Sequence, residues 1–220
     1  MFSKKNTKTC ILVCAGEFDA QKQKIADCSD GIVIAVDGGI TYCRQLGILP
    51  DMIIGDFDSA SAEDKVFITN TVNLENVVKL PAEKDDTDTV SAIRLGLKLG
   101  CKEFVIYGAT GGRIDHYFAN IQALLLIKHN GANGRIIGKD FDIFIIENES
   151  ITLKSKDKGT VSIFALGDRA THVSIKGLYY EVEDVELTND YPIGVSNEFC
   201  GQDAVITVGN GALVCMIGKA

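Results

Sequence analysis

The stretch EFVIYGATGGRIDH, residues 103–116, runs from an apolar segment through a glycine-rich turn to an arginine, an aspartate and a histidine. A short apolar run that ends in turn residues is typical of a buried strand. The next segment, 115–129, is rich in Ile, Ala and Leu and stops near Asn130-Gly131, which predicts a helix. The stretch therefore predicts a strand, a turn and a helix in succession.

The same order recurs three times nearer the start of the chain. Apolar runs at 32–36, 52–54 and 77–80 lead into turns that carry aspartate, at Asp37, at Asp56 and Asp58, and at Asp85, Asp86 and Asp88. In a parallel α/β sheet the carboxyl ends of the strands share one edge, and ligands bind there. Because gathered carboxylates repel each other, we expect a divalent cation to neutralise them, as in a Mg²⁺-phosphate site.

Up to about residue 140 the alternation predicts an α/β domain with a mostly parallel sheet between helices. The segment 87–99 has apolar residues at helical spacing, an acidic first turn and Gly100 as a stop signal. The expected strands are Cys10–Ala15, Ile32–Val36, Met52–Ile54, Val77–Leu80, Phe104–Tyr107 and Arg135–Ile137.

The pattern changes after residue 140, where short apolar segments alternate with turn residues and no amphipathic segment of helix length occurs. We therefore expect two domains, 1–140 and 141–220, the second an all-β sandwich of antiparallel strands. Ile206–Met216 predicts a hairpin about a Gly/Asn turn. The expected strands are Asp142–Ile146, Ile151–Leu153, Thr160–Leu166, Val173–Ile175, Val182–Leu187 and Ala204–Ile217.

Composition excludes several classes of protein. A net charge of −8 argues against binding to a nucleic-acid backbone, which needs a basic face. No apolar run reaches the roughly 18 residues that a membrane span needs, so we expect no membrane insertion. The seven cysteines are an odd number and most lie in apolar runs, which favours reduced, buried thiols and a cytoplasmic protein.

Asp56 and Asp58 are the first candidate metal ligands. Residues two apart in an extended chain point to the same side, about 6.5–7 Å apart at Cα, so their carboxylates can bracket one Mg²⁺. The alternative for this pair alone is a solvated turn at a strand end. Asp88 is the third candidate ligand, at the start of the predicted helix, where Thr87 or Asp86 could act as the cap.

The glycine-rich turn 108–113 is a candidate anion site, because backbone amides and a helix N-terminus can approach a phosphate there. It lacks the Gly-Lys-Ser/Thr of a P-loop. Arg113 suits bidentate phosphate binding, and Asp115 could bind metal or accept a proton. His116 is either catalytic or structural, whereas His129 and His172 have no recognisable partner and are interpreted as surface residues.

Two further groups complete the candidate nucleotide site. Asp37-Gly38-Gly39 follows a predicted strand, and its glycines would let a ribose or base lie against the backbone, although a tight turn alone explains the pattern equally well. Lys84 stands just before the acidic cluster, where it either offsets charge or touches a phosphate.

Taken together, these motifs resemble the thiamine pyrophosphokinase family. The matching pieces are Asp-Gly-Gly at 37–39, Gly-Asp-Phe-Asp-Ser at 55–59, Lys-Asp-Asp-Thr-Asp at 84–88, Gly-Gly-Arg-Ile-Asp-His at 111–116 and Ser-Asn-Glu at 196–198. The order and spacing agree over nearly the whole chain. The resemblance implies a homodimer that transfers the pyrophosphoryl group of ATP to the hydroxyl of thiamine, giving thiamine diphosphate and AMP.

The resemblance also implies roles for individual residues. Asp56, Asp58 and Asp88 would hold Mg²⁺, and Asp58, Asp88, Arg113 and Asp115 would be catalytic. Thiamine would lie against Tyr180, Ser196 and Asn197 of the β domain, which has no tryptophan to stack on the substrate ring. ATP would be bound by Asp37, Gly38, Gly39, Lys84, Thr87, Gly111, Gly112, Arg113 and His116.

Two other functions remain open at this level. A nucleotide-sugar transferase could use Asp56-x-Asp58 as its metal site, but it would not explain the Gly-Gly-Arg-x-Asp-His turn. A non-catalytic nucleotide or thiamine sensor would bind without turnover, but it could shed carboxylates that destabilise the fold without a cation.

Overall fold

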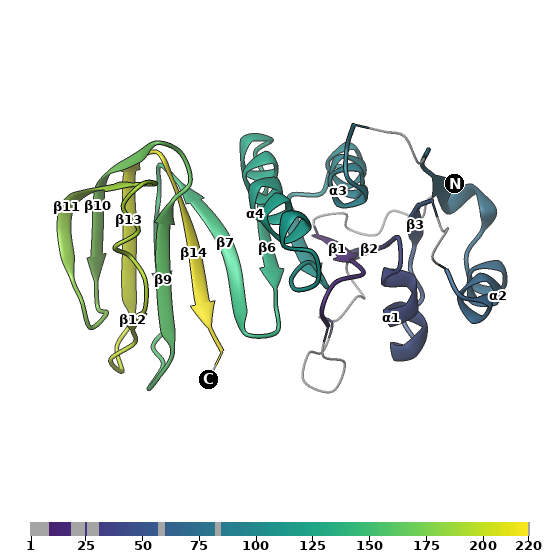
Figure 1. The fold of residues 1–220 in the computed structure, drawn as a ribbon, viewed down its shortest axis with the longest axis horizontal. Coiled ribbons are helices and arrows are strands. Elements are labelled where there is room, and N and C mark those ends of the chain that lie inside the picture. The colour runs from purple at the N-terminus through teal and green to yellow at the C-terminus, as the bar shows by residue number, and fades with distance from the viewer. Residues whose placement is uncertain (1–8, 19–24, 26–30, 57–59, 82–84, 220) are drawn as a thin grey trace. The chain divides into compact units, whose positions relative to one another are not determined.

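A computed structural model of the chain describes residues 9–18, 25, 31–56, 60–81 and 85–219. The chain divides into two compact units, Met1–Lys139 and Asp140–Ala220. Helices and strands alternate in the first unit, whereas the second contains strands only among its described elements (Figure 1). The predicted fold class, an α/β part followed by an all-β part, is confirmed.

The sheet of the first unit is parallel in all five of its described strand pairings. The strands are rich in Val and Ile, whose branched side chains pack well on a pleated surface. Their order across this unit is β6-β5-β1-β2-β3-β4. The strands are β1 Thr9–Val13, β2 Gly31–Val36, β3 Met52–Gly55, β4 Val77–Lys79, β5 Glu103–Tyr107 and β6 Asn133–Ile137.

Helices cover both faces of this sheet (Figure 1). Ile40 and Cys43 of α1 pack with Ile11 and Val13 of β1 on one face. On the other face α3 approaches closely, because a Cβ on Gly96 would lie 2.6 Å from the ring of Phe104. The helical elements are α1 Gly39–Leu46, α2 Ala62–Thr71, the 3₁₀ helix η2 Leu74–Asn76, α3 Asp88–Lys98 and α4 Ile114–His129.

The strand order contains one reversal, and it lies at β1. The chain adds β2, β3 and β4 on one side of β1 and then returns to add β5 and β6 on the other side. In parallel sheets such a reversal leaves a crevice at the carboxyl ends of the two strands that flank it. The turns that follow β1, β2 and β5 are therefore placed to form a ligand site.

The second unit is a sandwich of two antiparallel sheets. Their strand orders within this unit are β12-β9-β14-β7 and β11-β10-β13-β8. The strands are β7 Phe141–Glu147, β8 Ser150–Leu153, β9 Thr160–Ala165, β10 Arg169–Lys176, β11 Val182–Thr188, β12 Asn197–Glu198, β13 Ala204–Asn210 and β14 Ala212–Gly218. Alternate residues of both sheets fill one core, including Val161, Ile163, Val173, Ile175, Ile206, Val208, Leu213 and Cys215.

The predicted hairpin at Ile206–Met216 is wrong. The chain does reverse at Gly211, but β13 pairs with β8 and β10, while β14 pairs with β7 and β9. Gly211 has a φ of 102°, so it turns the chain from one sheet to the other. Ile206 and Leu213 consequently belong to different sheets, and both are buried in the core between them. Alternating apolar residues fit either arrangement, which is why the pattern could not separate them.

Strand β10 is longer than the predicted 173–175. Two shifts in its register with β11 interrupt the alternation of its residues, so the sequence pattern showed only part of the strand. His172 and Asp184 take left-handed backbone conformations, with φ of 54° and 53°. Their side chains meet across β10 and β11, with His172 Nδ1 2.7 Å from Asp184 Oδ1. The sequence predicts His172 to be a surface residue without a recognisable partner; it is exposed, but it is paired with Asp184.

Candidate functional site

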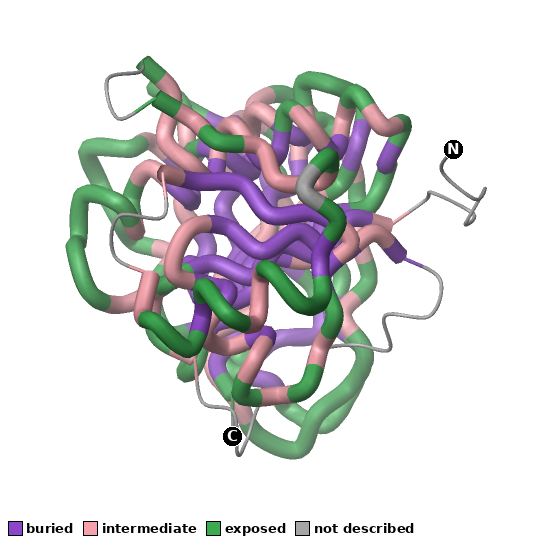
Figure 2. The backbone as a smooth tube through the Cα atoms, turned by 90° about the vertical axis from the view of Figure 1, so that its right-hand side faces the viewer, coloured by how far each residue is buried: buried purple, intermediate pink, exposed green. Residues whose placement is uncertain are grey.

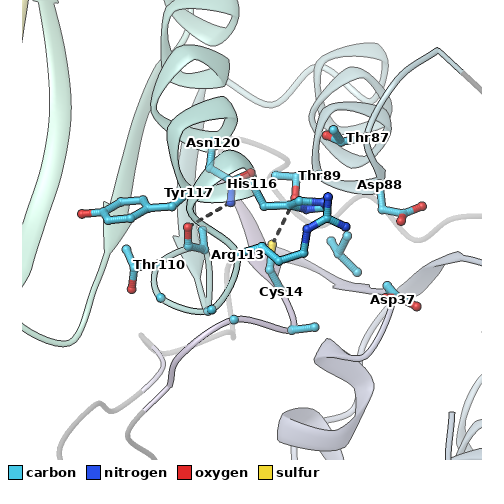
Figure 3. Close-up of a pocket in the computed structure, with 17 residues that line it drawn as sticks. Cys14, Asp37, Thr87, Asp88, Thr89, Thr110, Arg113, His116, Tyr117 and Asn120 are labelled. Atoms are coloured by element: carbon cyan, nitrogen blue, oxygen red, sulfur yellow. Dashed lines mark hydrogen bonds between the residues drawn. The ribbon is translucent and has the colours of Figure 1, made fainter. Parts of the chain in front are cut away.

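A pocket of about 280 Å³ lies at the carboxyl edge of the sheet in the first unit. Its walls come from the turns after β1, β2 and β5 and from the starts of α3 and α4 (Figure 3). This is the crevice expected at the reversal of strand order. Seven of the residues predicted to bind ATP or metal line it: Asp37, Thr87, Asp88, Gly111, Gly112, Arg113 and His116.

The floor of the pocket is the turn Gly108–Gly112. Gly108, Gly111 and Gly112 have φ values of 64°, 73° and 62°, a conformation that favours glycine. The turn after β1 is hydrogen-bonded to it, because Gly16 N donates to Gly108 O at 2.7 Å and Glu17 N donates to Thr110 O at 2.7 Å. The two turns therefore form one rigid backbone surface beside the N-terminus of α4, suited to an anionic ligand.

Asn120 and Thr110 also line the pocket, and the sequence motifs did not identify them. Asn120 is buried, and its Nδ2 donates to the carbonyl of Ala109 at 2.9 Å. Thr110 is also buried, and its Oγ1 has no hydrogen-bond partner among the residues that the structure describes. Only helical spacing could have indicated Asn120, since it lies about one turn beyond His116 on the same helix.

Cys14 lies at the back of the pocket with Thr89. Burial raises the pKa of the Cys14 thiol to about 12, and the charges of Asp88 and Asp37 add to that rise. A thiol with such a pKa is protonated at neutral pH and is a poor nucleophile. Its Sγ lies 3.8 Å from Thr89 Oγ1, so Cys14 contributes packing to the pocket wall.

Three of the predicted acidic residues lie at strand or helix ends in the described chain. Asp37 follows β2, Asp56 follows β3, and Asp88 is the first residue of α3. Asp37 and Asp88 line the pocket, while Asp56 is half-buried outside its wall. Asp58 lies outside the described residues, as does Lys84. Figure 3 shows Asp37 and Asp88 approaching the pocket from different elements.

Gly38 and Gly39 form the start of α1 and do not line the pocket. Gly38 is the residue before the helix, and Gly39 begins it. A Cβ on Gly39 would lie 1.8 Å from Val13 O, so only glycine lets α1 start this close to β1. The pair therefore sets where the chain leaves Asp37.

Thr87 is the N-cap of α3, because its Oγ1 accepts a hydrogen bond from Val90 N at 3.2 Å. This is one of the two caps that the sequence allowed. The other candidate, Asp86, accepts a hydrogen bond from Arg94 Nε at 2.8 Å. Asp86 is thus paired with Arg94 on the exposed side of α3, whereas Asp88 lines the pocket.

Arg113 and Asp115 form an exposed pair at the start of α4. Arg113 Nε donates to Asp115 Oδ1 at 3.2 Å, and Nη2 donates to Oδ2 at 2.6 Å. The hydrogen bond from Arg113 holds the pKa of Asp115 below its usual value, so this carboxylate is ionised at neutral pH. Arg113 and His116 line the pocket, whereas Asp115 does not.

The residues predicted to bind thiamine lie together in the second unit. Asn197 is buried, and its side chain accepts from Tyr180 N at 2.9 Å and donates to Tyr180 O at 2.7 Å. Tyr180 is exposed, and its ring meets that of Tyr179 edge-on at a centroid distance of 4.8 Å. Ser196 has a φ of 59°, and its N donates to Ser162 Oγ at 3.1 Å. Asn197 therefore positions the backbone of Tyr180.

A metal ion at this edge would need oxygen ligands, which Mg²⁺ prefers. The pocket supplies carboxylates from Asp37 and Asp88, so the donor chemistry fits. Within the ranges that the structure describes, no three His, Cys, Asp or Glu side chains are close enough together to hold a metal. None of the helices in those ranges combines the length and apolarity that crossing a membrane requires.

The parallel sheet, the reversal at β1 and the glycine-rich turn define the class of α/β proteins that bind phosphate-containing ligands at the carboxyl edge. Two family descriptions match the chain: the catalytic domain of thiamin pyrophosphokinase over residues 8–135, and the vitamin B1 binding domain of the same enzyme over residues 148–213. The chain therefore belongs to the thiamine pyrophosphokinase family.

Individual relatives agree with this assignment. The thiamine pyrophosphokinase of Bacillus subtilis is 27% identical over 182 residues, covering 82% of this chain and 84% of that protein. Its crystal structure superposes with a TM-score of 0.85 at 23% identity, covering 97% of this chain and all of the other. Thiamin pyrophosphokinase from Candida albicans superposes with a TM-score of 0.77 at 15% identity, covering 97% and 90%. At such identities the two superpositions show a shared fold.

Proposed function

We propose that this chain is a thiamine pyrophosphokinase, which transfers the pyrophosphoryl group of ATP to the hydroxyl of thiamine. One observation carries the proposal most directly. Seven residues taken from three separate sequence motifs of the family line a single pocket at the carboxyl edge of the sheet. That clustering, with the two family matches, favours this reaction over sugar transfer and over binding without turnover.

The first unit, the predicted domain 1–140, is the proposed ATP site. Gly111 and Gly112 would offer backbone amides to the phosphates, and Arg113 would contribute a cation with fixed charge. Arg113 would exchange its hydrogen bonds to Asp115 for bonds to phosphate oxygens. Since both side chains are exposed, that exchange needs little desolvation of the pair. The remaining proposed contacts are Asp37, Gly38, Gly39, Lys84, Thr87 and His116.

Asp56, Asp58 and Asp88 are the proposed Mg²⁺ ligands. When bound, Mg²⁺ would neutralise the phosphates and orient their oxygens. The carboxylates that follow β3 and the one that begins α3 then become favourable where they would otherwise repel one another. Asp58 and Asp88 would also act in catalysis, with Arg113 and Asp115, by holding the reacting groups in line.

The reaction joins the hydroxyl oxygen of thiamine to the β-phosphorus of ATP. The bond from that phosphorus to the oxygen bridging the α- and β-phosphates breaks, AMP leaves, and the hydroxyl proton is lost. Such transfers depend mainly on alignment and charge stabilisation. The rigid turn Gly108–Gly112 and the cation of Arg113 suit that task, because they need little reorganisation as charge shifts towards AMP.

The second unit, the predicted domain 141–220, is the proposed thiamine-binding and dimerisation domain. Tyr180 would stack on a thiamine ring, with Ser196 and Asn197 beside it. Exposed apolar side chains of the same unit, Tyr191, Ile193 and Val195, support a homodimer in which a second copy of the chain covers them. The six described cysteines are free thiols, which supports a cytoplasmic enzyme.

A product assay tests the proposal. The protein is incubated with ATP, Mg²⁺ and thiamine, and we expect AMP and thiamine diphosphate in equal amounts. Formation of ADP, or nucleotide binding without product over hours, would overturn pyrophosphoryl transfer. Consumption of nucleotide sugars without any reaction of thiamine would favour the sugar-transferase alternative.

A pair of variants tests the site. Asp88→Asn removes a charge from the pocket and should lower kcat by at least about 100-fold, a typical loss when one stabilising group of an active site is removed. Asp86→Asn, two residues earlier and paired with Arg94 on the exposed side of α3, is the matched control and should remain active. Equal activity of the two variants would remove Asp88 from the site.

A further inference from the structure

Helix α2 is attached to the first unit in an unusual way. Of its ten residues, all described, the one that is fully buried is an aspartate, Asp64. Its apolar residues contribute less, since Phe67 and Ile68 are only half-buried against the core and Val66 is 60% exposed. A surface helix normally buries an apolar stripe. The position of α2 therefore depends on a buried carboxylate.

Asp64 is fully engaged by hydrogen bonds from two helices. From α1, Arg44 Nε donates to Oδ1 at 2.8 Å and Thr41 Oγ1 donates to Oδ2 at 2.8 Å. From the start of α2, Ser61 Oγ donates to Oδ2 at 2.9 Å and accepts from Asp64 N at 3.1 Å. Ser61 and Asp64 thus form the capping box of α2, while Thr41 and Arg44 join the same carboxylate to α1.

A cluster of this kind fixes the relative position of the two helices more than it adds to the free energy of unfolding. Burying an ion pair often gains little over a well-packed apolar contact, because desolvation offsets the attraction between the charges. It does, however, accept only a narrow range of geometries, since Arg44 and Thr41 must each reach a particular oxygen. An apolar contact would allow α1 and α2 to slide relative to each other. The Asp64 cluster, defined as Asp64, Ser61, Thr41 and Arg44, does not.

The two helices that the Asp64 cluster joins begin just after two of the acidic turns. Helix α1 starts at Gly39, two residues after Asp37, and α2 starts at Ala62, six residues after Asp56. These turns also touch each other directly. Asp37 N donates to Ile54 O at 2.8 Å, and a Cβ on Gly55 would lie 3.0 Å from Asp37 Cα. The Asp64 cluster reaches Asp37 through the first turn of α1, where Ile40 N donates to Asp37 O at 3.4 Å and Thr41 N donates to Gly38 O at 3.1 Å.

We propose that Asp64, with Thr41 and Arg44, is a positioning residue that holds the start of α1, and with it Asp37, in the position needed to bind a magnesium–nucleotide complex. The inference rests on the proposed function, because it assumes that the carboxylate of Asp37 meets a metal-bound nucleotide. Asp64 itself lies outside the pocket wall and acts through the start of α1.

Calorimetry with a non-hydrolysable ATP analogue tests the inference without turnover. Asp64→Asn keeps the size of the side chain but removes its charge, and Thr41→Val removes one hydroxyl donor at nearly constant volume. Each variant is titrated with the analogue in excess Mg²⁺ and again in EDTA. We expect Kd in Mg²⁺ to rise about tenfold, equivalent to about 1.4 kcal/mol, with a much smaller change in EDTA. Thr41→Ser, which keeps the hydroxyl, should bind like the wild type.

Val72→Ala is the control for destabilisation alone. Val72 is buried at the end of α2, so its truncation loosens the packing of that helix while the Asp64 cluster stays intact. Urea unfolding of each variant shows whether the losses of stability are comparable. Weakening of Mg²⁺-nucleotide binding in Val72→Ala equal to that in Asp64→Asn would overturn the inference, as would equal weakening with and without Mg²⁺.

The wild type separates the two proposals. Suppose that the wild type and Asp64→Asn both bind the analogue more tightly in Mg²⁺ than in EDTA, and that their Kd values are equal. The positioning role is then wrong and the proposed function stands. If the wild type shows no dependence on Mg²⁺, the metal site itself is wrong, and the positioning role falls with it. If the wild type binds with Mg²⁺ but yields no thiamine diphosphate, the reaction is wrong while the positioning result still holds.

Discussion

Asn120 shows how one buried side chain can support the pocket. Its Nδ2 donates to the carbonyl of Ala109, the residue before Thr110 in the glycine-rich turn. In the proposed ATP site the turn would offer its backbone groups to the phosphates, so its geometry has to be held by residues outside the turn. An amide on α4, buried and directed at the backbone, meets that need, because a lost partner would leave a buried carbonyl unsatisfied.

We predict that Asn120→Ala raises the KM for ATP about tenfold and lowers the free energy of unfolding by about 1–3 kcal/mol, the cost of leaving a buried polar group unpaired. Steady-state kinetics and urea unfolding measure the two quantities. Asn130→Ala is the matched control, because its Nδ2 also donates to a backbone carbonyl, that of Leu126, at the exposed end of the same helix. An unchanged KM in Asn120→Ala would show that the turn holds its shape without this bond.

At the scale of elements, close approach of helices to the sheet sets the position of the site. Gly96 lets α3 lie directly against β1 and β5, and α3 carries Asp88 at its first residue. Figure 2 colours the backbone by burial, and the buried stretches lie mainly on the inside with the exposed stretches around them. The packing distance between α3 and the sheet therefore determines the position of Asp88.

For Gly96→Ala two effects compete. Alanine favours a helix over glycine by about 1 kcal/mol, but overpacking of a buried contact costs about 1–3 kcal/mol. The added Cβ would meet the ring of Phe104 at 2.6 Å and Cys10 Sγ at 2.9 Å, and both residues are fully buried. We predict a net loss of stability in thermal unfolding. Lys98→Ala, an exposed change in the same helix, should shift the free energy by less than about 0.5 kcal/mol, and a stabilised Gly96→Ala would contradict the close packing.

The contact between α1 and α2 predicts a dependence of stability on pH. Burial raises the pKa of Asp64, but hydrogen bonds from Arg44, Thr41 and Ser61 together hold it below its usual value. The unfolded value is about 3.9, so the stabilisation by the charged form is complete above that pH and is lost as pH falls through the lower, folded pKa. Glu63 and Arg44 are the charged neighbours.

We therefore predict that the wild type is more stable than Asp64→Asn at pH 7 and that this difference shrinks as the pH falls below about 4. Urea unfolding of both proteins over pH 3–7 measures it, and subtraction removes the contribution of the other carboxylates. A difference that stays constant over this range would mean that folding does not shift the pKa of Asp64, and a difference that grows as the pH falls would mean that the folded pKa is raised.

At the scale of the whole molecule, the chain keeps the proposed sites for its two substrates in separate units. The first unit has an open pocket, whereas the exposed apolar side chains Tyr180, Tyr191, Ile193 and Val195 lie in the second. Such side chains, grouped in two loops, are more typical of an interface than of a monomer's free surface.

We predict that the protein sediments at twice the chain mass of 23.7 kDa. The double variant Tyr191→Ser/Ile193→Ser should shift the equilibrium towards the monomer, because each change removes apolar area that the second copy would bury. Val205→Ser, an exposed apolar residue of β13, is the control and should leave the dimer intact. A wild type that sediments as a monomer at micromolar concentration would remove the homodimer from the proposal.

Much of the fold was predictable from periodicity. The six strands of the first unit and helices α3 and α4 were predicted close to their observed bounds, because buried parallel strands form continuous apolar runs and helices carry caps and stops. The family was predictable from ordered motifs. The path at Gly211 was not, because strands that pair and strands that face each other across a core have the same alternation.

The sequence by itself determined which residues are available for the chemistry: the acidic turns, the glycine-rich turn and Arg113 are local patterns with local causes. Only the tertiary structure decided which of them share a pocket, that Asp115 is engaged by Arg113, that Asn120 bonds to the glycine-rich turn, and that Asp64 joins α1 to α2. The physical reason is that a lone polar residue in a helix carries no signal of its own. Its role depends on a partner brought near by the packing of another element, and that distance is a property of the folded molecule.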